Sequence, residues 1–269
     1  MDRHNDSIVI PDAWRSVVRR LEGSVTLDVA GFATQFTLPL EHLEEVYLPL
    51  LTVLDAEATN GRVLAGLAGV PGSGKSSVAR LLQYVADEVW SPGRLVVVGM
   101  DGWHYPNAIL EQRWTTAPGG ERIPLRKRKG GPESFDVSAL ASALQLLRQA
   151  ATVVRVPVYD RRLHEPVPDG LQITPAARIV LIEGNYLLSP SPPWDAVSGC
   201  LRPRLFLDVD LPAARERVIA RHMRGGSSAE EAVARFEGND RLNTEAVLAT
   251  RSRADWLVSL TPSARLRSR

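Results

Sequence analysis

Short apolar runs alternate along most of the chain with longer stretches whose apolar residues recur every three or four positions. The runs Arg62–Ala68, Arg94–Met100 and Arg178–Ile182 have the length and composition of buried strands. Ser76–Val89 and Ser138–Ala150 have the spacing of amphipathic helices. Strands that alternate with helices predict an α/β fold, in which a mainly parallel sheet is covered on both faces and forms the middle of three layers.

Further elements continue this alternation towards the C-terminus. We expect strands at Val153–Val158 and Arg204–Val209, and a long helix from about Pro212 to Arg224. The connections at 103–133 and 160–175 are longer than the usual loops of compact domains. Such long connections are typical of segments that bind a ligand.

The first sixty residues follow another pattern. Glu41–Leu54 places apolar side chains at helical spacing, but Pro49 interrupts them, so the segment is either a kinked helix or two short helices. Thr59-Asn60-Gly61 then marks a turn. We therefore expect an N-terminal helical extension over residues 1–60, packed on a larger α/β domain over residues 61–269.

Composition excludes several classes of protein. The chain has 269 residues with a net charge of +1, so no global field attracts nucleic acid or an anionic membrane. Met1–Ile10 is polar and lacks the apolar core of a signal peptide, and no run approaches the roughly 18 apolar residues of a membrane span. Cys200 is the only cysteine, which excludes an internal disulfide. We expect a cytoplasmic protein with neither nucleic-acid nor membrane partners, and a homodimer is the default assembly.

Gly69-Val70-Pro71-Gly72-Ser73-Gly74-Lys75-Ser76 matches the phosphate-binding pattern G-x-x-x-x-G-K-[ST]. Its glycines let the backbone curl so that N–H groups face phosphate oxygens, Lys75 brings a charge to the β- and γ-phosphates, and the Ser76 hydroxyl can bind Mg²⁺. The motif lies between an expected strand and an expected helix, which is its proper context. We expect ATP and Mg²⁺ as cofactors, with the nucleotide bound by Gly69, Gly72, Ser73, Gly74, Lys75, Ser76 and Ser77.

A phosphate-binding loop does not by itself determine the reaction, because GTPases, motors and several kinases share it. Asp101 directly follows the strand at Arg94–Met100. A carboxylate at the carboxyl end of a strand beside the loop strand faces the γ-phosphate, where it could orient and deprotonate a hydroxyl. Asp101-Gly102 is also a common turn pair, so the spacing alone leaves both interpretations open.

Several short segments of the sequence are similar to segments of a known family. They are Leu48-Pro49-Leu50, Asp101-Gly102-Trp103, Lys129–Asp136, Pro157–Asp160 with His164, Ile182–Leu188 and Gly238–Asn243. Together they resemble the superfamily of P-loop metabolite kinases that contains pantothenate kinases, uridine kinases and phosphoribulokinases. The Pro-x-Tyr-Asp segment is similar to the acceptor segment of uridine kinases. The last two blocks are similar to bacterial fructokinase-like kinases.

The resemblance implies that the protein transfers the γ-phosphoryl group of ATP to a hydroxyl of a sugar, nucleoside or pantothenate-like metabolite. It implies that Asp101 is the general base. Glu183 ends an apolar strand, where it could hold Mg²⁺ together with Ser76 in the manner of a Walker B carboxylate. The alternative role for Glu183 is to fix a neighbouring loop.

Arg217, Arg221 and Arg224 lie four and three residues apart, so they share one face of the expected helix. Such a row can neutralise a transferring phosphoryl group, although in an arbitrary helix it is more often a solvated face. Gly225-Gly226 could act as a hinge, and the resemblance implies a lid over about 212–240. We expect Arg217 to contact ATP, and Arg221 and Arg224 to be catalytic together with Lys75 and Asp101.

A hydroxyl acceptor needs directional polar partners beside an apolar wall. Our candidates are Trp103, His104, Asn107, Tyr159, Asp160, Arg161 and His164. The basic run Arg126–Lys129 could attract an anionic substrate, but a solvated loop is its simpler interpretation. Three alternatives stay open: a dedicated pantothenate kinase, a nucleotide kinase that uses this basic run, and a regulatory P-loop NTPase that has no small-molecule acceptor.

Overall fold

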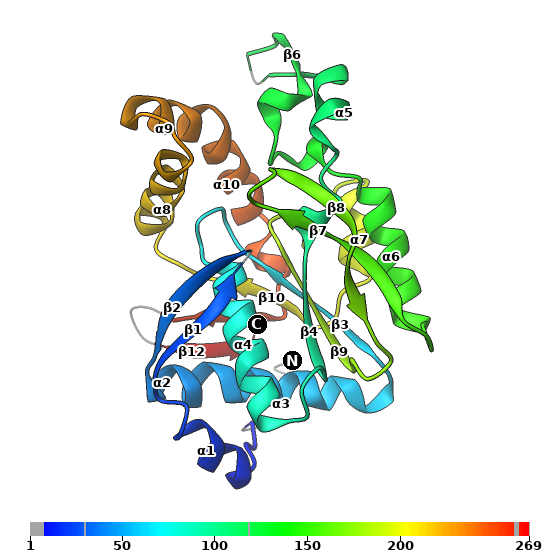
Figure 1. Cartoon of the computed structure of the whole chain (residues 1–269), viewed down its shortest axis with the longest axis vertical. Helices are drawn as coiled ribbons and strands as arrows, with labels where there is room; N and C mark the ends of the chain where they lie inside the picture. The colour runs from blue at the N-terminus through cyan, green and yellow to red at the C-terminus, as the bar shows by residue number, and fades with distance from the viewer. Residues whose placement is uncertain (1–7, 30, 118, 261–263, 269) are drawn as a thin grey trace.

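The centre of the molecule is a six-stranded sheet in the order β12-β11-β10-β3-β9-β4 (Figure 1). The computed structural model describes residues 8–29, 31–117, 119–260 and 264–268. All neighbouring strands are parallel except β12, which runs antiparallel to β11. This confirms the mainly parallel sheet expected from the alternation of elements. The strands are β3 (Val63–Ala68), β4 (Leu95–Gly99), β9 (Ile179–Gly184), β10 (Arg204–Leu207), β11 (Trp256–Ser259) and β12 (Arg265–Ser268).

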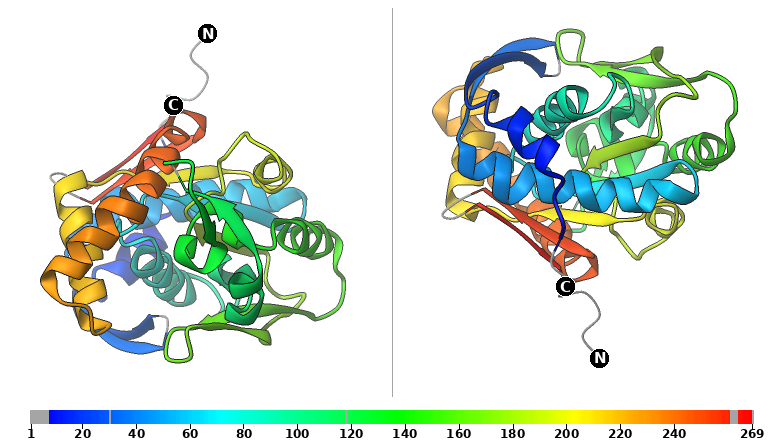
Figure 2. Two further views of the ribbon diagram at one scale, coloured as in Figure 1. Left: turned by 90° about the horizontal axis from the view of Figure 1, so that it is seen from above. Right: turned by 90° about the horizontal axis from the view of Figure 1, so that it is seen from below.

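Successive side chains of each strand enter two different cores, one on each face of the sheet. On β3, Val63 and Leu67 join one core, whereas Leu64 and Ala68 join the other. The first face is covered by α3 (Leu48–Glu57) and α4 (Lys75–Val89). The second is covered by α6 (Val137–Gln149), α7 (Trp194–Gly199) and α10 (Arg241–Leu248) (Figure 2). The chain therefore has the three-layer α/β/α arrangement of a P-loop fold.

The segment expected as a sheet strand at Val153–Val158 lies outside the central sheet. As β7 (Val154–Asp160) it pairs antiparallel with β8 (Glu165–Ile173) in a separate hairpin, and β8 fills most of the connection expected after it. Polar residues such as Arg155 alternate with buried ones, a pattern that suits a hairpin with one solvated face. Gly102 allows this hairpin to approach, because a Cβ there would lie 2.4 Å from the carbonyl oxygen of Pro157.

The N-terminal extension contains a β-hairpin in addition to the expected helices. Helix α1 (Asp12–Val18) precedes β1 (Gly23–Val29) and β2 (Phe32–Leu38), which pair antiparallel along their whole length. Exposed and partly buried residues alternate along both strands. Sequence analysis missed this hairpin although its period of two is visible at Val25 and Leu27 between polar neighbours.

A run of helix then leads from the hairpin towards the sheet. It consists of α2 (Leu40–His42), the π-turn η1 (Leu43–Tyr47) and α3, which begins one residue before Pro49. Proline lacks the N–H that would bond to the fourth residue before it, and the wider π-turn absorbs this mismatch. The run packs into the same core as α4, so the extension and the larger domain share one hydrophobic interior.

Two arms rise beyond the carboxyl ends of the central strands (Figure 1). One arm contains α8 (Leu211–Arg224), α9 (Ala229–Arg235) and the π-turn η6 (Phe236–Asp240). The other contains α5 (Asn107–Gln112), β5 (Trp114–Thr116), β6 (Arg122–Pro124), η4 (Leu125–Arg128) and η5 (Pro132–Ser134). Short 3₁₀ turns complete the fold at η2 (Ala58–Asn60), η3 (Met100–Trp103) and η7 (Arg251–Arg253). Within the described ranges no helix combines the length and the apolar character needed to cross a bilayer.

The shared core predicts that the extension and the α/β domain unfold together. Leu50 on α3 is fully buried, so Leu50→Ala should lower the free energy of unfolding by about 2–5 kcal/mol. Leu146→Ala on α6, where the side chain is 57% exposed, is the matched control and should change it by less than about 0.5 kcal/mol. Urea unfolding followed by circular dichroism and tryptophan fluorescence measures both. A separate early transition of the extension would contradict the shared core.

Candidate active site

The phosphate-binding loop curls between β3 and the first residue of α4. Gly72 and Gly74 have φ angles of +76° and +91°, conformations that side chains with a Cβ rarely adopt. Lys75 is 8% exposed, and its Nζ donates to the carbonyl oxygen of Val70 at 3.1 Å and to Ser73 Oγ at 3.5 Å. Burial lowers the pKa of Lys75 to about 8, against the opposing effect of Glu183 and Asp101. The ammonium group is thus held across the loop beside carboxylates.

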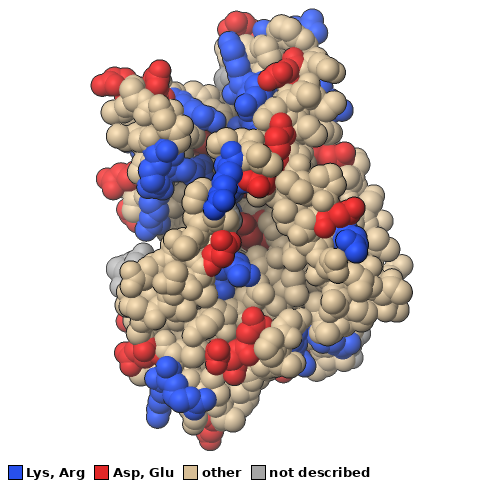
Figure 3. Space-filling model, in the orientation of Figure 1, with Lys and Arg blue, Asp and Glu red and all other residues tan. Residues whose placement is uncertain are grey.

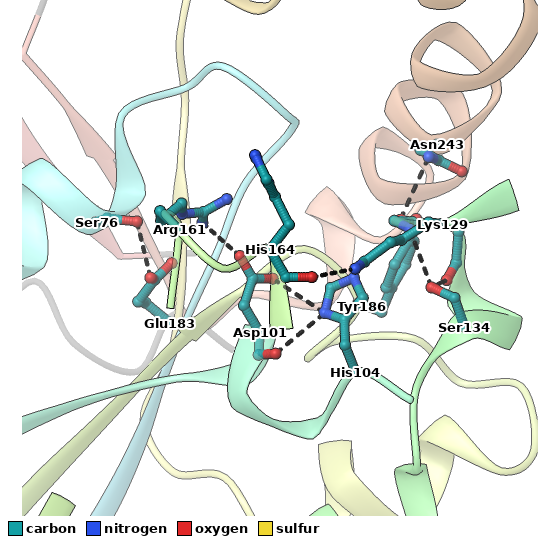
Figure 4. Close-up of polar contacts among 12 residues, drawn as sticks. Ser76, Asp101, His104, Lys129, Ser134, Arg161, His164, Glu183, Tyr186 and Asn243 are labelled. Carbon is teal, nitrogen blue, oxygen red and sulfur yellow. Dashed lines mark hydrogen bonds and ion pairs between the residues drawn. The ribbon is translucent and has the colours of Figure 1, made fainter. Parts of the chain in front are cut away.

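Glu183 lies on β9, the neighbour of the loop strand. Its Oε1 accepts a hydrogen bond from Ser76 Oγ at 2.8 Å (Figure 4). Burial raises the pKa of Glu183, and the nearby charge of Lys75 opposes this rise. Two oxygen atoms of the kind that bind hard cations are therefore adjacent at the loop.

Asp101 lies in η3, directly after β4, which is the strand on the other side of β9. Its Oδ2 accepts a hydrogen bond from Arg161 Nη2 at 2.5 Å (Figure 4). Burial by itself would raise the pKa of Asp101, but Arg161, with His104, Lys75 and Arg221, holds it below its usual value. The carboxylate is therefore ionised at neutral pH.

A group of aromatic rings lies next to Asp101. The His104 ring is 3.9 Å from the Phe135 ring and 5.3 Å from the Tyr159 ring, centroid to centroid. His104 Nδ1 lies 3.1 Å from the main-chain oxygen of Asp101, and burial lowers the pKa of the imidazole although Asp101 opposes the change. Burial also raises the pKa of Tyr159 to about 12. Both side chains are uncharged at neutral pH and can offer neutral hydrogen-bonding groups.

Lys129 lies among the candidate residues, although the sequence analysis assigned it to a solvated loop. Its Nζ donates to Asn107 Oδ1 at 2.6 Å and to the carbonyl oxygen of His164 at 2.7 Å, and it lies 5.2 Å from the centre of the Tyr159 ring. Burial lowers the pKa of Lys129 to about 8. In the sequence, the position of Lys129 directly before the Gly130-Gly131-Pro132 block was the feature that could have identified it as a candidate.

Two asparagines of the Gly238–Asn243 block hold the loop that carries Lys129. Arg128 donates to the side-chain oxygens of Asn239 and Asn243 and forms an ion pair with Glu133 at 3.0 Å. Asn243 Nδ2 and the Tyr186 hydroxyl both donate to the carbonyl oxygen of Gly130. The block thus positions the basic loop from the opposite arm.

The structure gives three of the expected acceptor residues other surroundings. Trp103 is 5% exposed and belongs to the hydrophobic core. Asp160 Oδ1 accepts the backbone N–H groups of Arg162 and Leu163 at 2.7 and 3.0 Å, so this carboxylate closes the β7–β8 turn. His164 has an exposed side chain and a φ of 55°, and its carbonyl oxygen accepts a hydrogen bond from Lys129 Nζ.

The arginines of α8 differ in their relation to the loop. Arg217 Nη1 donates to the carbonyl oxygen of Gly72 at 3.4 Å. The charge of Arg221 acts on both Lys75 and Asp101. Arg224, in the last turn of the helix, is exposed. α8 itself touches the loop, since a Cβ on Gly72 would lie 2.2 Å from the carbonyl oxygen of Ala214.

These groups fit a nucleoside triphosphate with Mg²⁺. Lys and Arg side chains gather over α8 and around β5 and β6, on both sides of the notch above the loop (Figure 3). Among the residues with a described placement, no group of three or more His, Cys, Asp or Glu side chains could hold a metal. Mg²⁺ usually takes one or two protein oxygens and completes its shell with phosphates and water, which suits the pair Ser76 and Glu183.

The Arg161–Asp101 ion pair predicts how the carboxylate titrates. Arg161→Met removes the charge that opposes burial, so the pKa of Asp101 should rise. A ¹³C NMR titration of labelled aspartate carboxyls measures this shift. Arg155→Met, which changes an exposed arginine of the same hairpin, should leave the titration as it is. An unchanged Asp101 titration in Arg161→Met would show that the ion pair does not control it.

Comparison with known proteins gives several relatives. No protein-family profile matches the chain. The uncharacterized protein YggC of Escherichia coli (strain K12) is 31% identical over 244 residues, which are 90% of this chain and 97% of that protein. "Putative uridine kinase C227.14" of Schizosaccharomyces pombe is 34% identical over 185 residues, 68% of this chain and 76% of that protein.

Solved structures also match this chain. The crystal structure of a "putative fructose transport system kinase" from Silicibacter sp. TM1040 matches with a TM-score of 0.65 and 32% identity, covering 76% of this chain and 94% of that one. Sequence relatives and this structure thus agree with the resemblance carried by the short blocks. The chain belongs to the superfamily of P-loop metabolite kinases that includes the uridine kinases and pantothenate kinases.

Proposed function

We propose that this P-loop kinase transfers the γ-phosphoryl group of ATP to a hydroxyl group of a small metabolite, namely a sugar, a nucleoside or a pantothenate-like compound. The observation that carries the proposal is the ionised Asp101 held by Arg161 at the mouth of the phosphate-binding loop. A carboxylate in this place has a use when a hydroxyl must be aligned and deprotonated. A hydrolytic regulator would not need it.

On the donor side, Gly69 and the loop from Gly72 to Ser77 would hold the phosphates, with Lys75 at the β- and γ-phosphates. Ser76 and Glu183 would hold Mg²⁺, which neutralises charge on the phosphates when bound. Arg217, which donates to Gly72, and Arg221, whose charge acts on Lys75 and Asp101, would close over the transferring group. Arg224, which is solvent-exposed as Arg217 and Arg221 are, would join them as α8 closes.

On the acceptor side, Asp101 Oδ2 is taken by Arg161, and Oδ1 lies 3.9 Å from His104 Nδ1. Asp101 Oδ1 would receive the proton of the attacking hydroxyl. Arg161 would keep the carboxylate oriented, since its guanidinium cannot lose its charge at neutral pH. His104, Asn107, Tyr159 and Lys129 would hold the remaining polar groups of the acceptor, and the aromatic rings would form its apolar wall.

A nucleotide kinase is the second candidate. Lys129 and Arg126 act on each other electrostatically, as do Lys129 and Arg235, so three cations from two arms share one region. Such a region favours an acceptor with an anionic group. The phosphate of a nucleoside monophosphate could interact with all three cations, whereas the single carboxylate of a pantothenate-like compound needs one.

The test is ADP release with panels of sugars, polyols, nucleosides, pantothenate and nucleoside monophosphates, followed by Asp101→Asn with the best acceptor. We expect stimulation by a neutral or monoanionic hydroxyl compound and little by monophosphates. Asp101→Asn should lower kcat by about 10²–10⁴-fold and leave ATP affinity nearly unchanged, because the loop holds the phosphates. A loss below about tenfold, or an equal loss of ATP binding, would remove Asp101 from this role. Preference for a monophosphate would favour the nucleotide kinase.

The pKa of Lys75 predicts how ATP binding depends on pH. Since that pKa is lowered to about 8, Lys75 is charged below this pH and neutral above it. ATP affinity should therefore fall by up to about tenfold per pH unit above 8, with proton uptake on binding. Calorimetry in buffers of different ionisation enthalpy measures both. Lys75→Met should bind weakly with a flat profile, whereas Lys129→Met should keep the wild-type slope. A wild-type slope in Lys75→Met would assign the titration to another group.

A further inference from the structure

The π-turn η6 joins the α8 arm to the hydrophobic core. Before it, α9 belongs to the arm, and after it, α10 is anchored in the core through Val247 (Figure 1). The turn carries the first three residues of the Gly238–Asn243 block, which has no part in the reaction proposed above. A π-turn inside a helix is uncommon and often marks a functional site. The block therefore lies at the junction between a projecting arm and the fixed core.

Asp240, the last residue of η6, is bound to α8. Its Oδ2 lies 2.8 Å from His222 Nε2, and both side chains are only 10% exposed. Because a carboxylate can only accept, Nε2 donates the proton of this hydrogen bond. His222 directly follows Arg221 on α8, and the charge of Asp240 also acts on Arg221. A hydrogen bond between two buried polar groups specifies one relative position of two helices, so Asp240 restrains α8.

Asn239, the residue before Asp240, is bound to the opposite arm. Its Oδ1 accepts a hydrogen bond from Arg128, and its Nδ2 donates to the main-chain oxygen of Lys129 at 3.3 Å. The side chain is 8% exposed, so water competes little for these two bonds. Two neighbouring residues of one turn thus hold two different arms, Asp240 the α8 arm and Asn239 the loop that carries Lys129.

The restrained helix is also the helix that meets the phosphate-binding loop. A Cβ on Gly72 would lie 2.8 Å from Val218 Cγ2, and Arg217 Nη1 donates to the carbonyl oxygen of Gly72 at 3.4 Å. Arg221 lies one turn further along α8, and its charge acts on Lys75. Phosphate groups held by the loop attract these arginines and so restrain α8. A restraint on α8 reaches η6 through the residue next to Arg221.

We propose that η6 positions both halves of the active site, with Asp240 positioning α8 for the donor and Asn239 positioning the Lys129 loop for the acceptor. Since one turn carries both residues, a nucleotide bound at the phosphate-binding loop stabilises the Lys129 loop on the other arm. The acceptor then binds to a loop that the donor has already ordered. The inference rests on the proposed function, in which the phosphate-binding loop holds the triphosphate and Lys129 faces the acceptor.

Hydrogen exchange at two glycine amides measures this effect without any acceptor. Gly130 N–H donates to Ser134 Oγ at 3.0 Å and Gly131 N–H to the carbonyl oxygen of Arg128 at 2.8 Å, so both amides exchange when the loop opens. The probe is the non-hydrolysable ATP analogue AMP-PNP with Mg²⁺, and NMR follows the exchange. Saturating probe should slow both amides about threefold to tenfold, the range of one hydrogen bond.

Asp240→Ala has a matched control on the same arm. It removes the bond to His222, so the probe should still bind at saturation but should no longer slow the two glycine amides. Glu245→Ala also removes one carboxylate, but Glu245 is 59% exposed and pairs with Arg241 on its own helix, so this variant should show the wild-type slowing. Slowing that persists in Asp240→Ala would make Asp240 a purely structural residue and overturn the proposal. Loss of the slowing in Glu245→Ala would overturn it as an effect of net charge.

Two substitutions of His222 separate its hydrogen bond from its packing. Glutamine can place an N–H where Nε2 lies, so His222→Gln should keep the slowing, whereas His222→Leu should lose it. Equal slowing in the two variants would contradict a link through Asp240. Asn239→Ala breaks the other half of the link, so it should speed the exchange of the ligand-free protein and remove the effect of the probe. Its affinity for the probe should be that of the wild type.

The wild-type protein separates this inference from the proposed function. Binding of the probe without any change at Gly130 and Gly131 would overturn the role of η6 and leave the phosphate-binding loop as the nucleotide site. Wild-type protein that does not bind the probe would overturn the proposed function together with this inference.

Discussion

The register of three parallel strands determines the geometry of the site. β9 pairs with β3 on one side and with β4 on the other, so Glu183 lies opposite both Leu67 and Gly99. Because parallel strands end at the same edge of a sheet, the residues that follow them meet there. The loop with Lys75 and the turn with Asp101 therefore flank Glu183 without any long side chain having to reach across. A register shift of one residue would reverse the faces of the strand and separate these groups.

Buried and partly exposed charges of both signs then balance one another at this edge. Lys75 is surrounded by two carboxylates and two arginines, and Asp101 is ionised because Arg161 compensates for its burial. The side chains of Arg161 and Asp101 are 32% and 31% exposed, whereas Lys75 is 8% exposed, so Lys75 depends most on the position of its neighbours. The β7–β8 hairpin contributes Arg161 and the α8 arm contributes Arg221. Displacement of Arg161 or Arg221 would therefore change the electrostatics at Lys75 and Asp101.

The N-terminal extension packs beside the phosphate-binding loop. Its helical run is part of the core beneath α4, so the hairpin it carries has a fixed position beside the loop. A pocket between them is lined by Phe36 and Tyr47 on one side and by Ser73 and Ser77 on the other. The run 40–57 therefore contributes both to the hydrophobic core and to the wall of this pocket.

The sequence alone determined the three-layer fold and the phosphate-binding loop, and it indicated Asp101 and Glu183 as strand-end carboxylates, because strand length, helical spacing and glycine placement are local properties. Tertiary structure decided the rest. Whether Lys129 is solvated or partly buried depends on Asn107 and His164, which are distant in sequence. Trp103 lies in a 3₁₀ turn and packs into the core, and hydrophobic periodicity does not predict such a turn. The β7 strand pairs with β8, the next strand in the sequence, and lies outside the central sheet, where its exposed Arg155 can face solvent. Contacts between remote residues carry no periodic signal, so only the folded chain shows them.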